Sequence, residues 1–258
     1  MPNKHIKKTL YVFLAIAFWF IVWEAASFLI SDNLKLFLPS PIAVLRALSR
    51  LVTMLSFWHS VILTLLRIFL GFICGVTAGI IFGILTSSFK LSDIIISPAM
   101  RVIRAVPVVS FIILAYLFIS VNYLPVFICF LMVMPLIWQT VHDGITNFDK
   151  DLTEMAKVFK IGGLKNLCFI KLTTISDEII SSMINGIGLA WKSGVASEVL
   201  CAPAISIGRN LYRAKGNISY DEVYAITLTI VILSIIIETL IKFSYRKKRK
   251  AEENNDKV

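Results

Sequence analysis

Charged residues are scarce in this chain of 258 residues: 16% are Asp, Glu, Lys or Arg, while 57% are hydrophobic. A water-soluble domain carries about 25% charged residues, since its surface has to hold water. The deficit therefore excludes an ordinary soluble domain. Several apolar runs instead approach the length of about 20 residues that crosses a hydrocarbon core about 30 Å thick. The composition predicts an all-α, polytopic membrane protein.

Cysteine and histidine are also few. The four cysteines form no Cys-x-x-Cys pair: Cys74, Cys129, Cys168 and Cys201. Such isolated cysteines are typical of small hydrophobic side chains and exclude a disulfide framework. The three histidines are scattered, so we expect no metal site: His5, His59 and His142. The patterns GxxxxGK[ST], HExxH and GxSxG are missing, and we expect no enzyme activity.

The net charge of +10 would suit a nucleic-acid partner. A surface that binds nucleic acid gathers Lys and Arg on one soluble face. In this chain they lie mostly between or beside the apolar runs, where they anchor and orient membrane helices. We therefore expect these charges to meet membrane lipid and no nucleic acid.

Six membrane spans can be placed along the chain. They cover about 10–30, 60–87, 105–120, 123–140, 179–202 and 223–243, with an earlier start as the alternative for the third. The first is too long for the apolar part of a signal peptide, so we interpret it as a retained span. The fifth is the most polar of the six, and a polar span does not face lipid.

Basic residues predict the orientation. If the N-terminus is cytoplasmic, 18 Lys and Arg residues fall inside and 6 fall outside. The inside set includes Lys90, Arg101 and Arg104, between the second and third spans. Because Lys and Arg concentrate on the cytoplasmic side, both termini are predicted to be cytoplasmic. We expect the protein in the cell (inner, cytoplasmic) membrane.

The segment after the first span contains a different helical pattern. Pro39 and Pro41 interrupt regular structure at its start. Apolar residues then recur at helical spacing: Val44, Leu45, Leu48, Leu51, Val52 and Leu55. With Arg46 and Arg50 between them, they predict an amphipathic helix at the membrane interface. The alternative is an apolar linker.

The second span contains glycine at every fourth position. These are Gly71, Gly75, Gly79 and Gly83. Residues four apart nearly superpose on a helix, so the glycines form a smooth groove that another helix can approach closely. The stripe predicts tight helix packing, within the core or between subunits.

Ionisable residues inside two spans indicate a polar path. Arg67 either lies on a pathway or partner contact, or reaches the nearby outer interface. Trp191 and Glu198 are seven residues apart and share a helical face, whereas Lys192 and Glu198 are six apart and cannot pair on one helix. The four candidate path residues are Arg67, Trp191, Lys192 and Glu198. The alternative for Glu198 is a solvated position near the outer face.

A basic segment, residues 147–173, separates the fourth and fifth spans. One helical stripe holds four apolar residues: Leu152, Met155, Ala156 and Phe159. Gly162 and Gly163 then break the helix, and helical spacing resumes at Leu164. The pattern predicts a short, exposed, cytoplasmic protrusion. Residues 244–258 are a charged tail whose basic part is expected near anionic headgroups.

This segment resembles the cytoplasmic loop of the membrane subunits of ABC importers. That loop carries Glu-Ala-Ala, then a glycine, then Leu-Pro. Glu154-Met155-Ala156 matches the first part, and Leu172 matches the leucine. Lys160 replaces the family glycine and Thr173 the proline. Four further stretches resemble the nitrate/sulfonate/taurine branch of these permeases: LPSPIAVLRAL, TLLRIFLGFICGVTAGIIFGIL, RAVPVVSFIIL and GLAWKSGVASEVL.

The resemblance implies a type I ABC importer permease fold in a single domain, 1–258, with a core at about 60–243. It implies a cytoplasmic ABC ATPase dimer, which would bind ATP and Mg²⁺, an extracytoplasmic substrate-binding protein, and a second copy of this chain. The chain itself would hold no cofactor. The coupling loop that contacts the ATPase would include Glu154, Met155, Ala156, Phe159, Lys160, Gly162, Gly163 and Leu164.

The alternative function is a secondary transporter without an ATPase. Such a protein needs buried acids on several spans to bind coupling ions, and only Glu198 is deep here. The resembled branch imports sulfonates, taurine and nitrate, and also thiamine-precursor pyrimidines and riboflavin-like compounds. Arg67, Arg209 and Arg213 would suit an anion, yet contacts with the binding protein explain the last two equally well. The substrate class stays open.

Overall fold

The computed structural model describes residues 4–30, 37–149, 152, 154, 155, 158, 159, 162, 163 and 170–255. This described part is helical and contains no strand. The chain divides into two compact units, Met1–His59 with Asn210–Val231, and Ser60–Arg209 with Ile232–Val258. We call them the smaller and the larger unit, and the single permease domain stays a prediction.

The smaller unit contains α1 (Lys4–Leu29), α3 (Pro41–Thr53), most of α12 (Ile207–Gly216) and the start of α13 (Tyr220–Asn255). α3 begins where its sequence favours a helix start. Ser40 caps it by accepting a hydrogen bond of 3.3 Å from the Ala43 amide, and Pro41 needs no backbone partner at the first position. Local sequence thus determines where this helix starts.

The amphipathic helix predicted after the first span is α3, but protein covers part of its apolar face. Val44 and Ala47 are buried in a cluster with Ala225, and Trp23 and Tyr224 pack against that cluster. Leu45 and Val52 remain exposed, at 49% and 43%. Arg50 forms an ion pair of 3.0 Å with Asp221. Only the outer part of the apolar stripe is therefore free to meet lipid.

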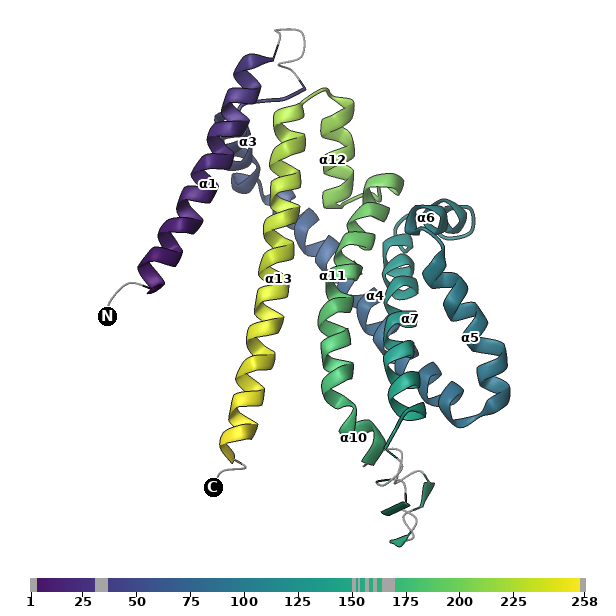
Figure 1. Cartoon of the computed structure of the whole chain (residues 1–258). Helices are drawn as coiled ribbons and strands as arrows, with labels where there is room; N and C mark the ends of the chain where they lie inside the picture. Colours follow the sequence, from purple (N-terminus) through teal and green to yellow (C-terminus); the bar gives the residue numbers. More distant parts are fainter. Residues whose placement is uncertain are drawn as a thin grey trace. The chain divides into compact units, whose positions relative to one another are not determined.

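The larger unit is arranged around α7 (Leu124–Thr146) (Figure 1). α11 (Ser176–Cys201), α5 (Lys90–Ala105) and α6 (Val108–Tyr116) all contact it. Twelve residues of α7 are buried, along its whole length. A helix that is apolar and buried on most sides is a core helix, so α7 positions the helices around it. The three-residue α10 (Leu172–Thr174) precedes α11.

The glycine stripe of α4 (Leu55–Ser88) faces α7. A β-carbon built on any of the four glycines would lie within 3.0 Å of an α7 atom. At Gly79 the neighbours are the Ile137 β-carbon and the Met134 carbonyl oxygen, each 2.7 Å away. Such contact distances require glycine, because any larger residue would force the two helices apart.

The membrane spans are only partly those expected from the sequence. Among the described residues, three helices are long and apolar enough to cross a membrane: Leu55–Ser88, Leu124–Thr146 and Tyr220–Phe243. The apolar part of α1, Leu14–Leu29, is shorter, and α11 is more polar. α5 and α6 together form one bent pair. Six spans and cytoplasmic termini stay predictions.

The third expected span, 105–120, is not a straight helix. α5 already begins at Lys90, and α6 turns away from it by 105° at Val106 and Pro107. With nine residues, α6 is about 14 Å long and cannot cross a membrane alone. Proline has no amide hydrogen and ends the preceding helix, which explains the position of the bend.

Because of this break, two arginines lie in a helix and not in the predicted loop. Arg101 and Arg104, counted with Lys90 in an inside loop, lie within α5, eleven and fourteen residues beyond its first residue. Removing them from the inside count leaves 16 basic residues against 6 outside. The predicted orientation does not depend on them.

We predict that Gly79→Val lowers the apparent melting temperature of the purified protein. Overpacking of a close contact costs about 1–3 kcal/mol, since the α4 and α7 backbones would have to separate. Gly216→Ala is the matched control, because no atom lies within 4 Å of a β-carbon built there. Equal melting temperatures for both variants would contradict the close packing of α4 against α7.

Candidate functional site

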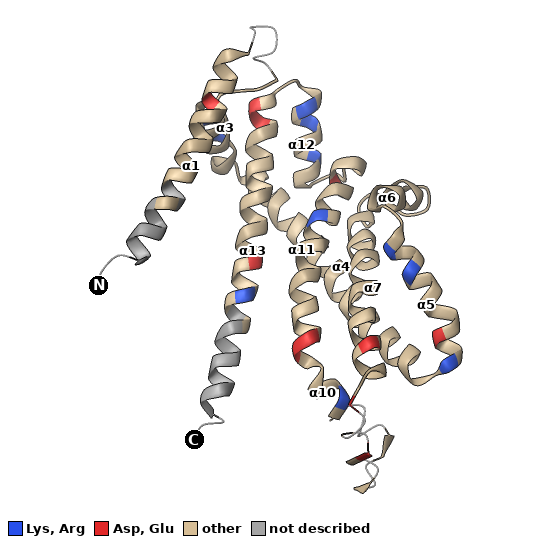
Figure 2. Ribbon diagram, in the orientation of Figure 1, with Lys and Arg blue, Asp and Glu red and all other residues tan. Residues whose placement is uncertain are grey.

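α11 presents a polar stripe on its exposed side. Glu178, Ser181, Asn185 and Lys192 are exposed, at intervals of three, four and seven residues, so they share one helical face. We call these four residues the polar stripe. Leu189 is the exposed residue between Asn185 and Lys192, at 38%. Figure 2 shows charged positions of both signs along α11. This face of the helix therefore meets water or polar groups.

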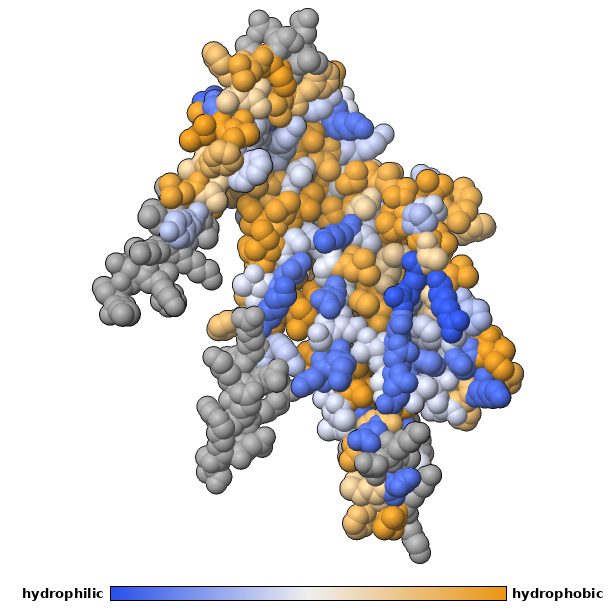
Figure 3. Space-filling model, viewed as in Figure 1, coloured by the Kyte–Doolittle hydropathy of each residue, from blue (hydrophilic) through white to orange (hydrophobic). Residues whose placement is uncertain are grey.

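Neighbouring helices extend this polar surface. Gln139 of α7 donates a hydrogen bond of 3.1 Å to the exposed Asp143, one turn further along. Arg101 and Arg104 of α5 are exposed as well. In Figure 3, hydrophilic side chains gather over α11, α7 and α5 on the face in view. The larger unit thus has one polar face built from three adjoining helices.

The exposed surface of α4 has the opposite character. Ile62, Leu66, Phe69 and Ile73 are between 45% and 58% exposed. Lipid can cover such side chains without loss. An isolated Lys at the bilayer centre costs about 2.5–3.5 kcal/mol on insertion scales, so lipid does not suit the polar stripe. The contrast indicates which side of the larger unit is turned away from lipid.

Arg67 and Glu198 form the one ion pair found between α4 and α11 among the described residues. An Arg67 guanidinium nitrogen lies 3.3 Å from Glu198 Oε1 and donates a second hydrogen bond, of 2.7 Å, to the Ile205 carbonyl. The Thr64 hydroxyl donates to Glu198 Oε2 at 2.7 Å. Glu198 is fully buried, and the Arg67 side chain is 17% exposed. We call this cluster the Arg67–Glu198 node.

The node holds the chain reversal between α11 and α12. Ala202 ends α11 in a left-handed conformation, with φ of 46°. The Gly208 amide donates to Glu198 Oε2 at 3.4 Å, and the Ile207 amide donates to Thr64 Oγ1 at 3.1 Å. One carboxylate thus joins α4, the end of α11 and the start of α12. A buried charge is stable only when paired and hydrogen-bonded in this way.

The four candidate path residues therefore separate into two groups. Arg67 and Glu198 neutralise each other in the node, and Glu198 is not solvated. Trp191 is 2% exposed. Lys192 points to the other side of α11 and is exposed.

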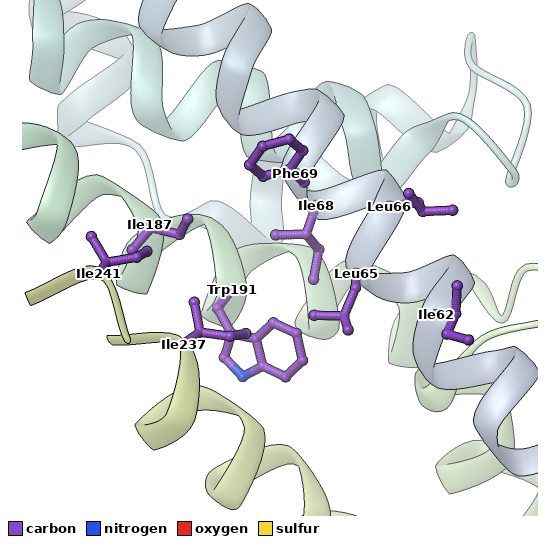
Figure 4. Close-up of a pocket in the computed structure, with 9 residues that line it drawn as sticks. All are labelled: Ile62, Leu65, Leu66, Ile68, Phe69, Ile187, Trp191, Ile237 and Ile241. Carbon is purple, nitrogen blue, oxygen red and sulfur yellow. The ribbon is translucent and has the colours of Figure 1, made fainter. Parts of the chain in front are cut away.

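Trp191 lines an apolar groove within the larger unit. The groove has a volume of about 420 Å³ and is lined from α4, α11 and α13 (Figure 4): Ile62, Leu65, Leu66, Ile68, Phe69, Ile187, Trp191, Ile237 and Ile241. None of these side chains is charged. Trp191 and Glu198 do share a face of α11, as their spacing predicts, but that face packs against α4.

The described part of the basic segment is exposed. Met155, Val158 and Phe159 are 41%, 78% and 72% exposed, and Glu154 is exposed beside them. The Phe159 amide donates to the Met155 carbonyl at 3.0 Å, a helical turn. Gly162 and Gly163 are exposed, with open space at both β-carbon positions. Ala156, Lys160 and Leu164, also expected in the coupling loop, lie outside the described residues.

Sequence reasoning missed most of the stripe and the node. Glu178 and Ser181 could have been found by extending the helical face of Asn185 and Lys192 towards the start of α11. Thr64 lies one turn before Arg67, which is a weak signal for a shared partner. The Ile205 carbonyl gives no sequence signal at all. No group of three or more His, Cys, Asp or Glu that could hold a metal was found among the described residues.

These features define an integral, multi-pass membrane protein with one polar face among otherwise apolar helices. The family model "Binding-protein-dependent transport system inner membrane component" matches residues 75–250. Because the match covers more than half of the chain, the protein belongs to this family. It is therefore a membrane component of a transport system, in a family that is not an enzyme family.

Curated relatives and a solved structure agree with this assignment. The nitrate import permease protein NrtB of Leptolyngbya laminosa is 25% identical over 72% of this chain and 67% of its own. SsuC of Bacillus subtilis, named for aliphatic sulfonate transport, is 22% identical over 81% and 76%. An inward-facing structure of the MetNI methionine ABC transporter has a TM-score of 0.65 at 16% identity, over 77% of this chain and 96% of its own. The chain is thus a type I ABC importer permease subunit in fold and family.

We predict that Arg67→Met destabilises the protein more than the double variant Arg67→Met/Glu198→Gln. The single variant leaves a buried carboxylate without its cation, a change that costs about 3–5 kcal/mol in protein interiors. The double variant removes both charges and keeps most of the hydrogen bonds of the side chain. Thermal unfolding of the wild type and the Arg67→Met, Glu198→Gln and double variants measures the coupling. Strictly additive effects would show that the pair does not interact.

Proposed function

We propose that this chain is the pore-forming subunit of an ATP-driven importer for a small anion of the nitrate or sulfonate type. Two copies would form the pore in the cytoplasmic membrane, with the polar face of the larger unit turned towards the path. A cytoplasmic ATPase dimer would bind ATP and Mg²⁺, and an extracytoplasmic binding protein would deliver the substrate. The polar stripe on α11 is the observation that carries this proposal.

The stripe supports a path because it lies on a helix that packs among membrane helices. Glu178, Ser181, Asn185 and Lys192 are distributed over 15 residues, which is about four turns. Irregular or polar surface at membrane depth is tolerated where it is buried in protein or lines a water-filled cavity. A second subunit that encloses this face would supply such a cavity. Two copies would also explain why one chain shows only half of a path.

The exposed segment supports an ATPase partner. Met155 and Phe159 present apolar area at the surface, and hot spots of protein interfaces are built from such side chains. Glu154 adds a charge beside them. If the ATPase holds this segment, closure of the ATPase dimer on ATP would move it and alternate access to the pore. The family assignment implies ATPase and binding-protein partners in general.

The contacts of the acidic residues give little support to the alternative function, a secondary transporter. A carrier driven by ions needs deep acids that can bind them. Glu198 is already bound by Thr64, Arg67 and the Gly208 amide. Glu238 of α13 accepts a hydrogen bond of 3.3 Å from Lys242. Both acids already have protein partners, and the other two candidates, Glu24 and Glu178, lie near the ends of their predicted spans.

We predict that the double variant Glu154→Arg/Phe159→Asp abolishes ATP-driven uptake and leaves membrane insertion intact. The change removes an apolar contact and reverses a charge on the exposed segment, so the ATPase would no longer bind this segment. Uptake and co-purification of the ATPase subunit are the measurements, and Phe159→Leu, which keeps the apolar surface, is the control. Normal uptake by an inserted double variant would refute the role of this segment in coupling.

We also predict that Asn185→Cys, in a chain without other cysteines, reacts with a membrane-impermeant thiol reagent in the assembled transporter. Leu66→Cys on α4 should stay unreactive, although its parent side chain is 58% exposed in the isolated chain. The reason is that water would reach the polar stripe, whereas lipid would cover α4. The opposite labelling pattern would place the path on the other side of the larger unit.

A further inference from the structure

Lys192 is the only Lys or Arg of α11, every residue of which the structure describes. No described residue pairs with or accepts a hydrogen bond from its ammonium. It lies 16 residues after Ser176 and nine before Cys201, the ends of α11. Nine residues correspond to about 14 Å of helix, and one side chain does not span that distance to the helix end. Lys192 therefore lies more than two turns from either end of α11, on the exposed side of the helix.

Arg67, the cation of the node itself, is excluded as a substrate contact. Arg67 is the only basic residue in α4, and both of its acceptors are protein groups, Glu198 and the Ile205 carbonyl. Its charge is cancelled by a carboxylate that is fully buried. The sequence left open whether Arg67 contacts an anion, and the structure pairs its guanidinium with Glu198 and the Ile205 carbonyl instead.

The acid closest to this part of α11 does not neutralise Lys192. Glu238 Oε1 lies 3.1 Å from the position of a β-carbon built on Gly188, one turn before Lys192. Glu238 is already paired with Lys242, 3.3 Å away. Glu178, the acid of the polar stripe, lies 14 residues before Lys192. Arg101 and Arg104 of α5 add further positive charge to the polar face. Glu238 and Lys242 carry opposite charges that cancel, so Lys192 adds one positive charge to this part of α11.

We propose that Lys192 contacts the charged group of a small oxyanion in the translocation path. This rests on the proposed function, and it names the residue of the path that contacts the anionic substrate. A single ammonium is a compact point charge, while an Arg would bind nitrate or sulfonate oxygens in a bidentate manner. A transport site has to bind well enough for entry and weakly enough for release. One lysine among Leu189, Asn185 and water meets that requirement.

The first test needs no knowledge of the substrate. Leu189→Cys, in a chain without other cysteines, places a thiol one turn before Lys192. The assembled transporter is treated with two methanethiosulfonate reagents of similar size, one with an anionic sulfonate and one with a cationic ammonium. We expect the anionic reagent to react faster by roughly tenfold when Lys192 is present, because a nearby cation attracts it and repels the other.

Variants at Lys192 provide the controls. Lys192→Met should abolish this charge preference, and Lys192→Arg should retain it. Lys90→Met removes an exposed lysine from the first turn of α5 and should change nothing. If both reagents react at rates that do not depend on Lys192, the role of Lys192 is overturned, while the proposed path along the polar stripe is still supported. If neither reagent reaches Leu189→Cys or Asn185→Cys, the proposed path itself is wrong.

Uptake then tests the substrate class. Nitrate, methanesulfonate and taurine, and hydroxymethylpyrimidine as the uncharged comparison, are offered to the transporter reconstituted with its ATPase and binding protein. We expect Lys192→Met to raise the KM for the transported anion at least roughly tenfold, with Lys192→Arg restoring most of it. Transport of the pyrimidine alone would overturn the inference, as would an unchanged KM for an anion.

Discussion

Polar groups inside a bilayer have to be satisfied by protein or water, and this constraint organises the larger unit. Lipid can cover the exposed apolar side chains of α4. It cannot cover four turns of polar residues on α11 without a penalty of several kcal/mol. The helix therefore needs protein on one side and a polar environment on the other. Its buried side packs on α4 and α7, and its exposed side carries Asn185 and Lys192.

Close packing around α7 fixes that arrangement. The glycine stripe lets α4 approach α7 to a distance that no larger residue allows. Gly194 of α11 lies equally close to Ile68 and to the Cys129 sulfur, where a β-carbon would be 2.7 Å from either. α11 therefore sits in the angle between α4 and α7. The Arg67–Glu198 node then locks the end of α11 to α4 and to the start of α12. With both contacts in place, α11 cannot rotate, so the polar stripe keeps its direction.

The sequence predicts some of these elements because their signals are local. The helix start at Ser40 and Pro41 and the glycine repeat both depend on residues close in sequence, while the helix break at Gly162 and Gly163 stays a prediction. The pairing of Arg67 with Glu198 does not, because the partners are 131 residues apart. Hydropathy placed the third span at 105–120 since Val108 to Tyr116 is strongly apolar. The bend at Pro107 depends on how α5 and α6 both pack on α7, which hydropathy does not report. The two sides of α11 could be separated only once its neighbours were known.

We propose that the polar face of the larger unit turns towards a second copy of the chain. Distances between spin labels on the two copies in lipid nanodiscs test this most directly. One label replaces Asn185 on the polar stripe, and the other, in a separate sample, replaces Leu66 on α4. We expect the distance between the two labels to be shorter when they are at position 185 than when they are at position 66. A shorter distance from position 66, or no dipolar coupling from position 185, would contradict it.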